Sequence, residues 1–368
     1  MRRAVLWIVV ATVAFASGCR VRVSDDGGAC THLQATRKVR GLALCEDAWT
    51  CERPPGTEID RVGLHRLALC DGATGPVVFY LPGMHMNGAL PFIDPRYDVR
   101  VYLAQAGIRV WSIDYRTHTV PPDASPATLR TLGRWDIDVF TGDAVWAIGF
   151  QRALDPGQLV LMGFSFGGGF AYRLASREDV HPTGLVILDA AAAEGRAESG
   201  EPVIDVGSAR LAYAERARLL DAVIANPDGP SPIPGYASAE AALADILFTS
   251  KSFGGDGGLS AAKDGVSEIE PLAHLLRMYD RWWPRGVLTG AAPKPPGTPL
   301  PVLAFSSTRM GPQWTERVEA SARQWGGAQA QVRMLPDFGH LDVLVGRAAP
   351  HLVFEPIRRW LVGGSPGK

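Results

Sequence analysis

The sequence predicts an α/β fold, in which a mostly parallel β-sheet is covered by helices on both faces and carries an inserted helical cap. Short, continuously apolar runs such as 77–81 have the character of strands buried on both faces. They alternate along the chain with segments whose apolar residues recur at helical spacing, such as 137–154. Residues 190–298 break this alternation because they contain helical segments but no convincing strand, and this break predicts the cap.

The composition is that of an ordinary globular protein. Of the 368 residues, 46% are hydrophobic and 20% are charged, and the formal net charge is -1. The sequence has no run of Lys and Arg that would follow a phosphate backbone, so we expect no nucleic-acid partner.

The N-terminus has the pattern of a secretory signal. Arg2 and Arg3 precede an apolar run over 4–16, which is too short for a transmembrane helix, and small residues lead to Cys19. The ending Ala-Ser-Gly-Cys resembles the lipobox of bacterial lipoproteins, in which the cysteine is lipidated; the alternative is a plain signal peptide. We expect residues 1–18 to be removed and Cys19 to anchor an exported protein to a bacterial membrane. The sequence leaves inner and outer membrane of the cell envelope open.

The other cysteines support export. They are Cys30, Cys45, Cys51 and Cys70. An even number clustered in an exported segment predicts two disulfides, although the sequence does not choose among the three pairings. The spacing contains no Cys-x-x-Cys, so we expect no zinc or other metal site. Residues 19–62 are interpreted as a Cys-containing extension that disulfides attach to the main domain.

The remaining elements follow from apolar runs bounded by turn residues and from helical spacing. Strands are expected over 63–70, 77–81, 108–113, 159–162, 185–188, 301–305 and 331–335. Helices are expected over 98–106, 137–154, 170–176, 209–225, 238–249, 268–283 and 352–361. Residues 63–189 and 299–368 therefore form the predicted core, and 190–298 the predicted cap.

A Gly-x-Ser-x-Gly pattern lies between a predicted strand and a predicted helix. It consists of Gly163, Ser165 and Gly167. A serine on such a sharp turn is held in a strained conformation that bulky neighbours would disturb, and the turn lifts its hydroxyl clear of the sheet. This context predicts Ser165 as a nucleophile, whereas the alternative is a glycine-rich turn with an incidental serine.

A serine hydroxyl needs a base, and His340 is the candidate. It follows the last predicted strand, at the edge where α/β sheets hold their ligands. In chain order the serine comes first and the histidine lies near the end, which is a known order for the members of a catalytic triad. A histidine on such a loop is often only structural, which is the alternative.

With these residues in view, the chain over 63–361 resembles an α/β hydrolase of the esterase/lipase type. The segment 339–342 is similar to the end of the acid-lipase group. The resemblance implies an α/β-hydrolase fold and a Ser-His-acid triad, with the acid in many members just after the strand that matches 301–305. Here 306–311 read SSTRMG, and no carboxylate appears before Glu316.

The acid is therefore assigned through a variant of the fold. A minority of members place the acid after the preceding strand, and Asp189 stands at that point, directly after 185–188. Asp189 is the predicted third member of the triad, which would orient the imidazole. The alternative is a polar residue that caps a turn, with Glu194 as the fallback acid. Asp342 is expected to turn away and bind local backbone.

The oxyanion hole needs two N–H donors. One is expected from the backbone of Phe166, the residue after the nucleophile, and the other from Met84 in the loop after 77–81. The family usually has His-Gly in that loop, and this chain has Pro82-Gly83. Backbone donors depend little on side-chain identity, so the difference leaves the prediction intact.

These residues predict hydrolysis of a carboxylic ester through an acyl-enzyme on Ser165, without a metal or organic cofactor. The substrate would be a small-molecule or lipid-like ester. The alternatives are an amide hydrolase or acyltransferase with the same residues, and a non-catalytic surface lipoprotein that binds a ligand or partner. Substrate identity and oligomeric state stay open.

Three aromatic residues and two histidines are secondary candidates. Trp282, Trp283 and Phe253 in the cap either line an apolar substrate site or form the cap's own core. His85 and His118 lie on loops near the proposed site and either contact substrate or belong to the ordinary surface.

Overall fold

The computed structural model describes residues 20–21, 29–39, 41–72, 75–92, 94–192, 200–207, 211–248 and 258–363. The predicted signal peptide over 1–18, the lipidation residue Cys19, the fallback acid Glu194 and Phe253 lie outside the described residues. Among the helices that are described, none is long and apolar enough to cross a bilayer.

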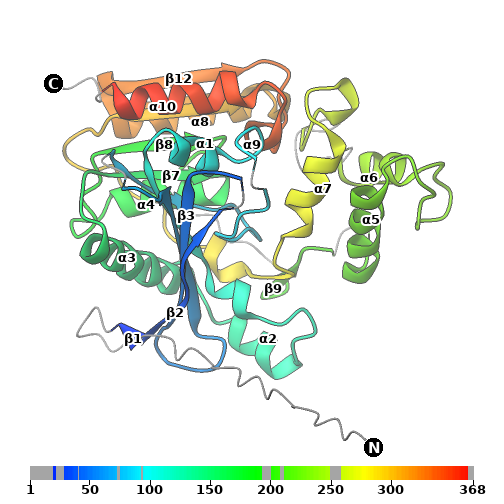
Figure 1. Ribbon diagram of the computed structural model, residues 1–368, viewed down its shortest axis with the longest axis horizontal. Helices are drawn as coiled ribbons and strands as arrows, with labels where there is room; N and C mark the ends of the chain where they lie inside the picture. The colour runs from blue at the N-terminus through cyan, green and yellow to red at the C-terminus, as the bar shows by residue number, and fades with distance from the viewer. Residues whose placement is uncertain are drawn as a thin grey trace, which may run out of the picture.

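The described part of the chain forms a central ten-stranded sheet in the order β1-β2-β3-β4-β6-β5-β7-β8-β11-β12 (Figure 1). Its strands are β1 (Arg20–Val21), β2 (Cys30–Lys38), β3 (Leu44–Glu52), β4 (Arg61–Leu69), β5 (Val77–Leu81), β6 (Arg109–Asp114), β7 (Leu159–Phe164), β8 (Gly184–Leu188), β11 (Val302–Ser307) and β12 (Ala330–Leu335). The strands from β6 to β12 pair in parallel, which confirms the predicted fold class. Those from β1 to β6 pair antiparallel, which the sequence did not predict.

Helices cover both faces of the sheet. One face is covered by α1 and α10 and the other by α3, α4 and α8. The helices of the described chain are α1 (Val99–Gln105), α2 (Pro126–Leu132), α3 (Ile137–Leu154), α4 (Phe166–Ala175), α5 (Tyr213–Ala225), α6 (Ala239–Phe248), α7 (Ile269–Arg277), α8 (Pro312–Gly326), α9 (Asp342–Val345) and α10 (Glu355–Val362). Shorter 3-10 or π turns occupy Arg116–Thr119, Ala262–Asp264, Arg285–Leu288, Thr308–Met310, Gly327–Gln329 and Pro350–Phe354.

The alternation of side chains along each strand builds two cores. In β5, Val78 and Tyr80 pack with α1 and α10 on one face. Phe79 and Leu81 pack with α3, α4 and α8 on the other. Successive strand residues point to opposite faces, so a strand covered on both sides must be apolar throughout. This explains why the uninterrupted apolar runs predicted these strands correctly.

The predicted cap holds three helices that lie together at one end of the molecule (right in Figure 1). Apolar side chains of α5, α6 and α7 pack onto the same core as α1 and α10. The segment also contains a separate two-stranded sheet, β9 (Val203–Asp205) with β10 (Trp282–Pro284), which was not predicted. The helix predicted over 268–283 therefore ends early, at Arg277, because the chain after it joins β10.

The described residues of the N-terminal segment predicted as an extension, residues 19–62, belong to the main sheet. They supply β2 and β3, so the boundary drawn at Gly63 does not separate two structural units. The four cysteines form two disulfides, as predicted. The pairing is Cys30–Cys51, across facing positions of β2 and β3, and Cys45–Cys70, from β3 to the residue that follows β4.

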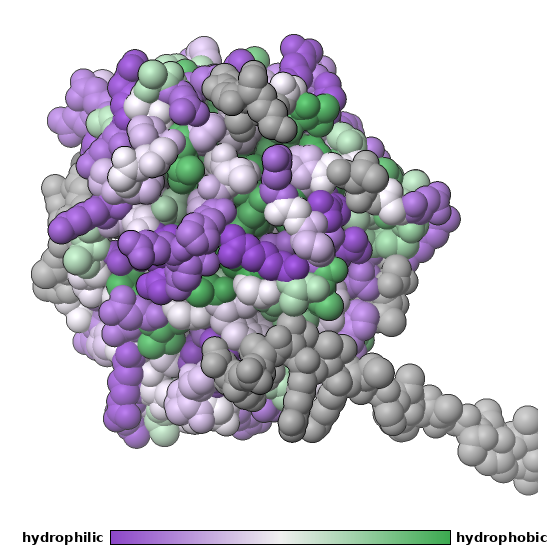
Figure 2. Space-filling model, turned by 90° about the vertical axis from the view of Figure 1, so that its left-hand side faces the viewer, coloured by the Kyte–Doolittle hydropathy of each residue, from purple (hydrophilic) through white to green (hydrophobic). Residues whose placement is uncertain are grey.

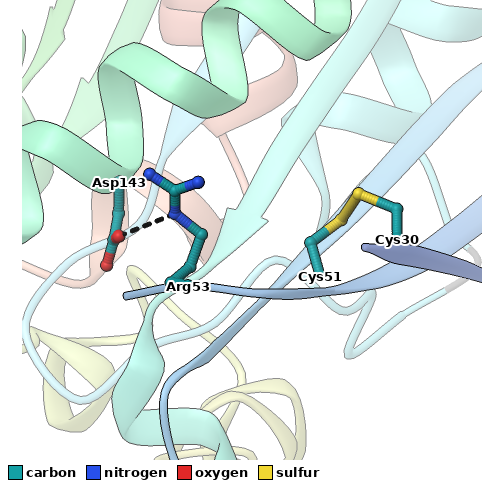
Figure 3. The surroundings of a disulfide bond; sticks show 4 residues. All are labelled: Cys30, Cys51, Arg53 and Asp143. Atoms are coloured by element: carbon teal, nitrogen blue, oxygen red, sulfur yellow. Dashed lines mark hydrogen bonds and ion pairs between the residues drawn. A yellow bond between two sulfur atoms is a disulfide. The ribbon is translucent and has the colours of Figure 1, made fainter. Parts of the chain in front are cut away.

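Buried ion pairs tie the first disulfide to a helix. Two residues after Cys51, the Nε of Arg53 donates to Asp143 on α3 over 3.0 Å (Figure 3). Asp143 also accepts from the Nε of Arg116 over 2.5 Å, and Arg116 reaches Asp60 over 2.5 Å. These charges are almost fully enclosed, so each depends on its partners, and losing one would leave another buried and unpaired.

Hydrophilic residues prevail on the face of the molecule shown in Figure 2. Hydrophobic residues appear there only in scattered patches among the coloured atoms. Scattered patches are normal for a folded domain, because its polar atoms cannot cover the whole surface.

Candidate active site

Ser165 lies on the tight turn between β7 and α4. Its backbone has φ 52° and ψ -121°, a conformation that costs about 1–3 kcal/mol for a residue with a side chain. A Cβ at Gly163 would lie 2.1 Å from the carbonyl oxygen of Gly167, and one at Gly167 would lie 1.9 Å from that of Leu81. Only glycine fits at either position, because both collisions are with backbone. The pattern that drew attention to Ser165 thus follows from the packing of the turn.

His340 is on the loop after β12 and faces Ser165. Its Nε2 lies 2.8 Å from the Oγ of Ser165, and its backbone N–H donates to the carbonyl of Gly258 over 2.8 Å. The ring lies against that of Phe164, tilted by 33° with 4.8 Å between centroids, and the residue is 5% exposed. The loop and the neighbouring aromatic ring therefore hold the imidazole in one orientation.

Asp189 completes the constellation. Its Oδ2 lies 2.6 Å from the Nδ1 of His340, and its Oδ1 accepts from the backbone N–H of Ser307 over 2.7 Å and from the Nε1 of Trp314 over 2.9 Å. The side chain is fully buried. These contacts hold the carboxylate in place beside the imidazole, as the third member of a triad requires.

The sheet order explains how an acid after β8 reaches the place usual for one after β11. The two strands are neighbours and run parallel, so their carboxyl ends lie side by side. Asp189 has φ 47°, which turns its side chain across toward β11. Ser307 occupies the site where the resemblance placed the acid, and its N–H binds Asp189 instead.

The carboxylates of Asp342 and Glu316 do not serve His340. Asp342 accepts from the hydroxyls of Ser260 and Ser267, both over 2.6 Å, and from the backbone N–H of Ala261 and of Gly339. It turns to local backbone, as expected, and also joins the predicted cap to the histidine loop. Glu316 is exposed on α8.

The contacts fix the tautomer of the imidazole. An ionised carboxylate only accepts hydrogen bonds, so the Nδ1 of His340 carries the proton that is donated to Asp189. The Nε2 is then an acceptor, and the hydroxyl of Ser165 donates to it. This is the arrangement in which His340 can remove a proton from Ser165.

Phe166 follows Ser165 directly and Met84 lines a cavity together with Ser165, so their backbone N–H groups are the candidates for oxyanion donors. Within the described residues, neither the N–H of Phe166 nor that of Met84 donates a hydrogen bond. Phe166 is the first residue of α4, so its N–H lies at the positive end of the helix dipole, which also stabilises a negative charge there. The loop of Met84 is fixed by the N–H of Gly88, which donates to Asp114 over 2.6 Å.

Two cavities meet at Ser165. The first, of about 270 Å³, is also lined by His340 and by apolar side chains such as those of Phe164, Leu259 and Leu276. The second, of about 200 Å³, is lined by side chains that include Phe166, Phe170, Val287, Arg173 and Trp314. A substrate bound across Ser165 can therefore place one part in each cavity.

The secondary candidates differ in whether they line one of the two cavities. Trp283 is fully buried, packs against Phe140 and Phe166, and lines neither cavity, so it belongs to the core. His85 lines the first cavity. His118 instead binds the carboxylate of Asp280 over 2.9 Å.

Several residues of the site carry no recognisable signal in the sequence. Ser307 and Trp314 hold Asp189, but a serine at a strand end and a tryptophan on a helix carry no recognisable pattern. Arg216, which lines the first cavity from α5, lies far from the triad in sequence and in a helix with ordinary amphipathic spacing. Only the folded chain brings these residues to the site.

Comparison with known proteins agrees with this geometry. A model of the alpha/beta hydrolase family matches residues 78–356. Solved structures that are similar include a provisionally assigned lipase from Sulfolobus solfataricus, with 24% identity and a TM-score of 0.70 over 87% of this chain and 95% of that chain. A thermophilic esterase from Thermogutta terrifontis has 21% identity and a TM-score of 0.47 over 84% of this chain and 96% of that chain.

The Cif epoxide hydrolase from Acinetobacter nosocomialis has 13% identity and a TM-score of 0.48, over 88% of this chain and 90% of that chain. No curated protein matches the sequence. At these identities the likeness to solved structures shows the fold, whereas the activity has to be argued from the site.

Proposed function

The chain belongs to the alpha/beta hydrolase family, and from this premise we propose that it cleaves carboxylic esters through an acyl-enzyme on Ser165, with His340 as general base and Asp189 as triad acid. One observation carries the proposal. A continuous relay of hydrogen bonds joins the three side chains, with 2.8 Å from Ser165 to His340 and 2.6 Å from His340 to Asp189. The strained serine and the two candidate N–H donors support the same chemistry.

Acylation begins when the Nε2 of His340 takes the hydroxyl proton of Ser165. The Oγ attacks the ester carbonyl, and the negative charge that develops on the carbonyl oxygen is stabilised by the N–H groups of Phe166 and Met84. Asp189 stabilises the imidazolium. His340 then gives its proton to the leaving alcohol, which departs and leaves the acyl group on Ser165.

Deacylation repeats these steps with water. His340 takes a proton from a water molecule, whose oxygen attacks the acyl carbonyl. The same N–H groups stabilise the second tetrahedral intermediate. His340 returns the proton to the Oγ of Ser165, and the carboxylic acid is released.

The only support for a non-catalytic binding protein is the absence of an acid directly after residues 301–305. Asp189 supplies a carboxylate at that place, so this argument is removed. A binding protein also has no use for a serine in a conformation that costs stability. Amide hydrolysis and acyl transfer would use the same three residues, and they are distinguished from ester hydrolysis by assay.

The test is hydrolysis of 4-nitrophenyl esters of increasing acyl length by the purified protein, beside matched anilides. We expect turnover of the esters, a chain-length optimum that reports the size of the cavities, and labelling of Ser165 by a fluorophosphonate probe. Ser165→Ala should lose both activity and labelling. No turnover of any ester together with no labelling would refute the proposal and favour the binding function.

We also propose that the protein is exported and anchored to a bacterial membrane by lipid on Cys19. The lipobox-like ending and the two disulfides support this proposal, because disulfides persist in oxidising compartments. Metabolic labelling with a fatty-acid analogue should mark the wild-type protein and not Cys19→Ala, which should partition into the soluble fraction. A labelled Cys19→Ala variant would contradict the proposal.

A further inference from the structure

The first cavity at Ser165 contains a buried cation that the proposed mechanism does not use. Arg216 extends from α5 and lines the cavity together with Ser165 and His340. It is only 6% exposed. The remaining lining is largely apolar, so the guanidinium is a marked exception there.

The contacts of Arg216 leave its charge without a counter-ion. Its Nη1 donates to the backbone carbonyl of Leu276 over 3.0 Å, and its guanidinium lies 5.5 Å from the ring centroid of Tyr279. Within the described residues it makes no other hydrogen bond and no ion pair. The carbonyl is in the last turn of α7, where the helix dipole is negative, and the aromatic ring also favours a cation. Both are weaker partners than a carboxylate.

The nearest acidic group of the cavity is already occupied. The Oδ2 of Asp205 accepts from the Nε of Arg281 over 2.9 Å, and its Oδ1 accepts from the N–H of Gly207 over 2.9 Å. The pair of Asp205 and Arg281 is neutral overall. Asp205 therefore attracts Arg216 only from a distance, and it is not free to bind a cationic ligand.

The other titratable groups of the cavity do not offset this charge. Burial lowers the pKa of His85 to about 4, so His85 is neutral near pH 7. Its Nδ1 donates to the carbonyl of Asp280 over 2.9 Å. Burial also lowers the pKa of Arg216, but a guanidinium starts so high that it stays protonated. Among the described residues that line the cavity, Arg216 is therefore the one cation whose charge no neighbouring group offsets.

We propose that Arg216 binds a carboxylate of the substrate, so that the ester cleaved at Ser165 is an anionic one whose carboxylate lies in the first cavity. The inference rests on the proposed esterase function and specifies its substrate class. A guanidinium with free N–H groups binds a carboxylate through two parallel hydrogen bonds, which are strong in a site that excludes water. Burying an unpaired cation is unfavourable, and a ligand that pairs with it relieves this cost.

Two matched pairs of esters test the proposal. In the first pair, mono-4-nitrophenyl glutarate and 4-nitrophenyl valerate differ only by a carboxylate in place of the terminal methyl of the acyl chain. In the second, 4-acetoxybenzoate and 4-tolyl acetate carry the same difference on the alcohol. After correction for alkaline hydrolysis, we expect the anionic ester of at least one pair to have a kcat/KM about 10- to 100-fold higher. No preference in either pair would overturn the inference.

Variants separate recognition from a structural role. Arg216→Gln should reduce the preference for the anionic ester to near unity. Arg277→Gln is the matched control, because Arg277 also joins α7 to α5, through Asp221 over 2.7 Å, but lines neither cavity. It should keep the preference. If Arg216→Gln lowers both esters of a pair equally and keeps their ratio, Arg216 is structural and the inference is wrong.

Binding without turnover distinguishes failure of this inference from failure of the proposed function. Calorimetry with Ser165→Ala should give a Kd for the favoured anionic ester about 10-fold or more below that of its neutral partner. Equal Kd values overturn the inference even if the esterase is active. Conversely, a protein that hydrolyses neutral esters without preference keeps its proposed function and loses this substrate class.

Discussion

The two halves of the central sheet contain different functional and structural features. The parallel half, β6 to β12, bears Ser165, Asp189 and His340 on the loops at its carboxyl edge. The antiparallel half, β1 to β4, bears both disulfides and supplies Arg53 and Asp60 to the buried ion pairs, but no residue of the candidate site.

The difference follows from strand direction. Parallel strands end at one common edge, so loops far apart in sequence meet there and can combine their side chains. Antiparallel strands joined by short connections alternate their ends, and neighbouring cysteines in facing positions can be linked directly. We infer that the parallel half determines activity and the antiparallel half determines stability.

The largest expected effect tests the parallel half. Ser165→Ala should lower kcat by about 10⁶-fold, because a triad acts as a unit. The melting temperature should stay within about 2 °C of wild type, since the change removes only an oxygen from a half-buried side chain. Steady-state kinetics and calorimetry measure the two quantities. A kcat within tenfold of wild type would show that Ser165 is not the nucleophile.

Asp189→Asn should have the next largest effect. We expect kcat to fall about 10³- to 10⁴-fold, because an amide cannot hold His340 in the required tautomer or stabilise imidazolium. Glu316→Gln is the matched control, since Glu316 is the first carboxylate after β11 but is exposed, and it should behave as wild type. An active Asp189→Asn enzyme would mean that another carboxylate serves the histidine.

The antiparallel half should respond in the opposite way. Replacing Cys30 and Cys51 together by Ser should lower the free energy of unfolding by about 3 kcal/mol, as for a loop of 21 residues. Below the melting temperature, kcat should be unchanged. Urea unfolding followed by tryptophan fluorescence gives the stability. A large loss of kcat in the folded variant would show that the two halves are coupled.

The pH dependence of stability should be a smaller effect, and it also arises from a residue of the antiparallel half. Burial disfavours the charged form of His65 on β4, but the carboxylates of Asp114 and Glu46 outweigh it and raise the pKa of His65 to about 9. The unfolded pKa is near 6.5, so this stabilisation is complete below pH 6.5 and is lost as the pH rises to about 9. The loss should be at most about 3 kcal/mol.

Melting curves between pH 6 and 10 measure this slope. His65→Gln should be less stable at low pH and should show a flatter profile than wild type. A hydrogen bond to Asp280 raises the pKa of His118 to about 9 as well, but this side chain is 41% exposed. His118→Gln should therefore remove less of the slope. Parallel profiles for wild type and His65→Gln would contradict the assignment.

Much of the parallel half was predictable because its signals are local. Strands buried on both faces are apolar throughout, and the turn at Ser165 tolerates only glycine at Gly163 and Gly167. The antiparallel half was harder to predict. In β3, Glu46 and Asp47 are buried although they are acidic, because His65 and Arg66 on the facing strand β4 pair with them. Because these buried residues are charged, the hydropathy pattern of the sequence does not reveal the strand.

The sequence by itself determined the fold class, the position of Ser165 and His340, and the presence of two disulfides, because each depends on residues close together in the chain or on composition. Only the tertiary structure decided which cysteines pair, that Asp189, which the resemblance offered as the acid, contacts His340, and that Arg216 shares a cavity with Ser165. These contacts join segments distant in sequence. Their physical cause is the order of strands in the sheet and the packing of α5 against α7, which no single segment encodes.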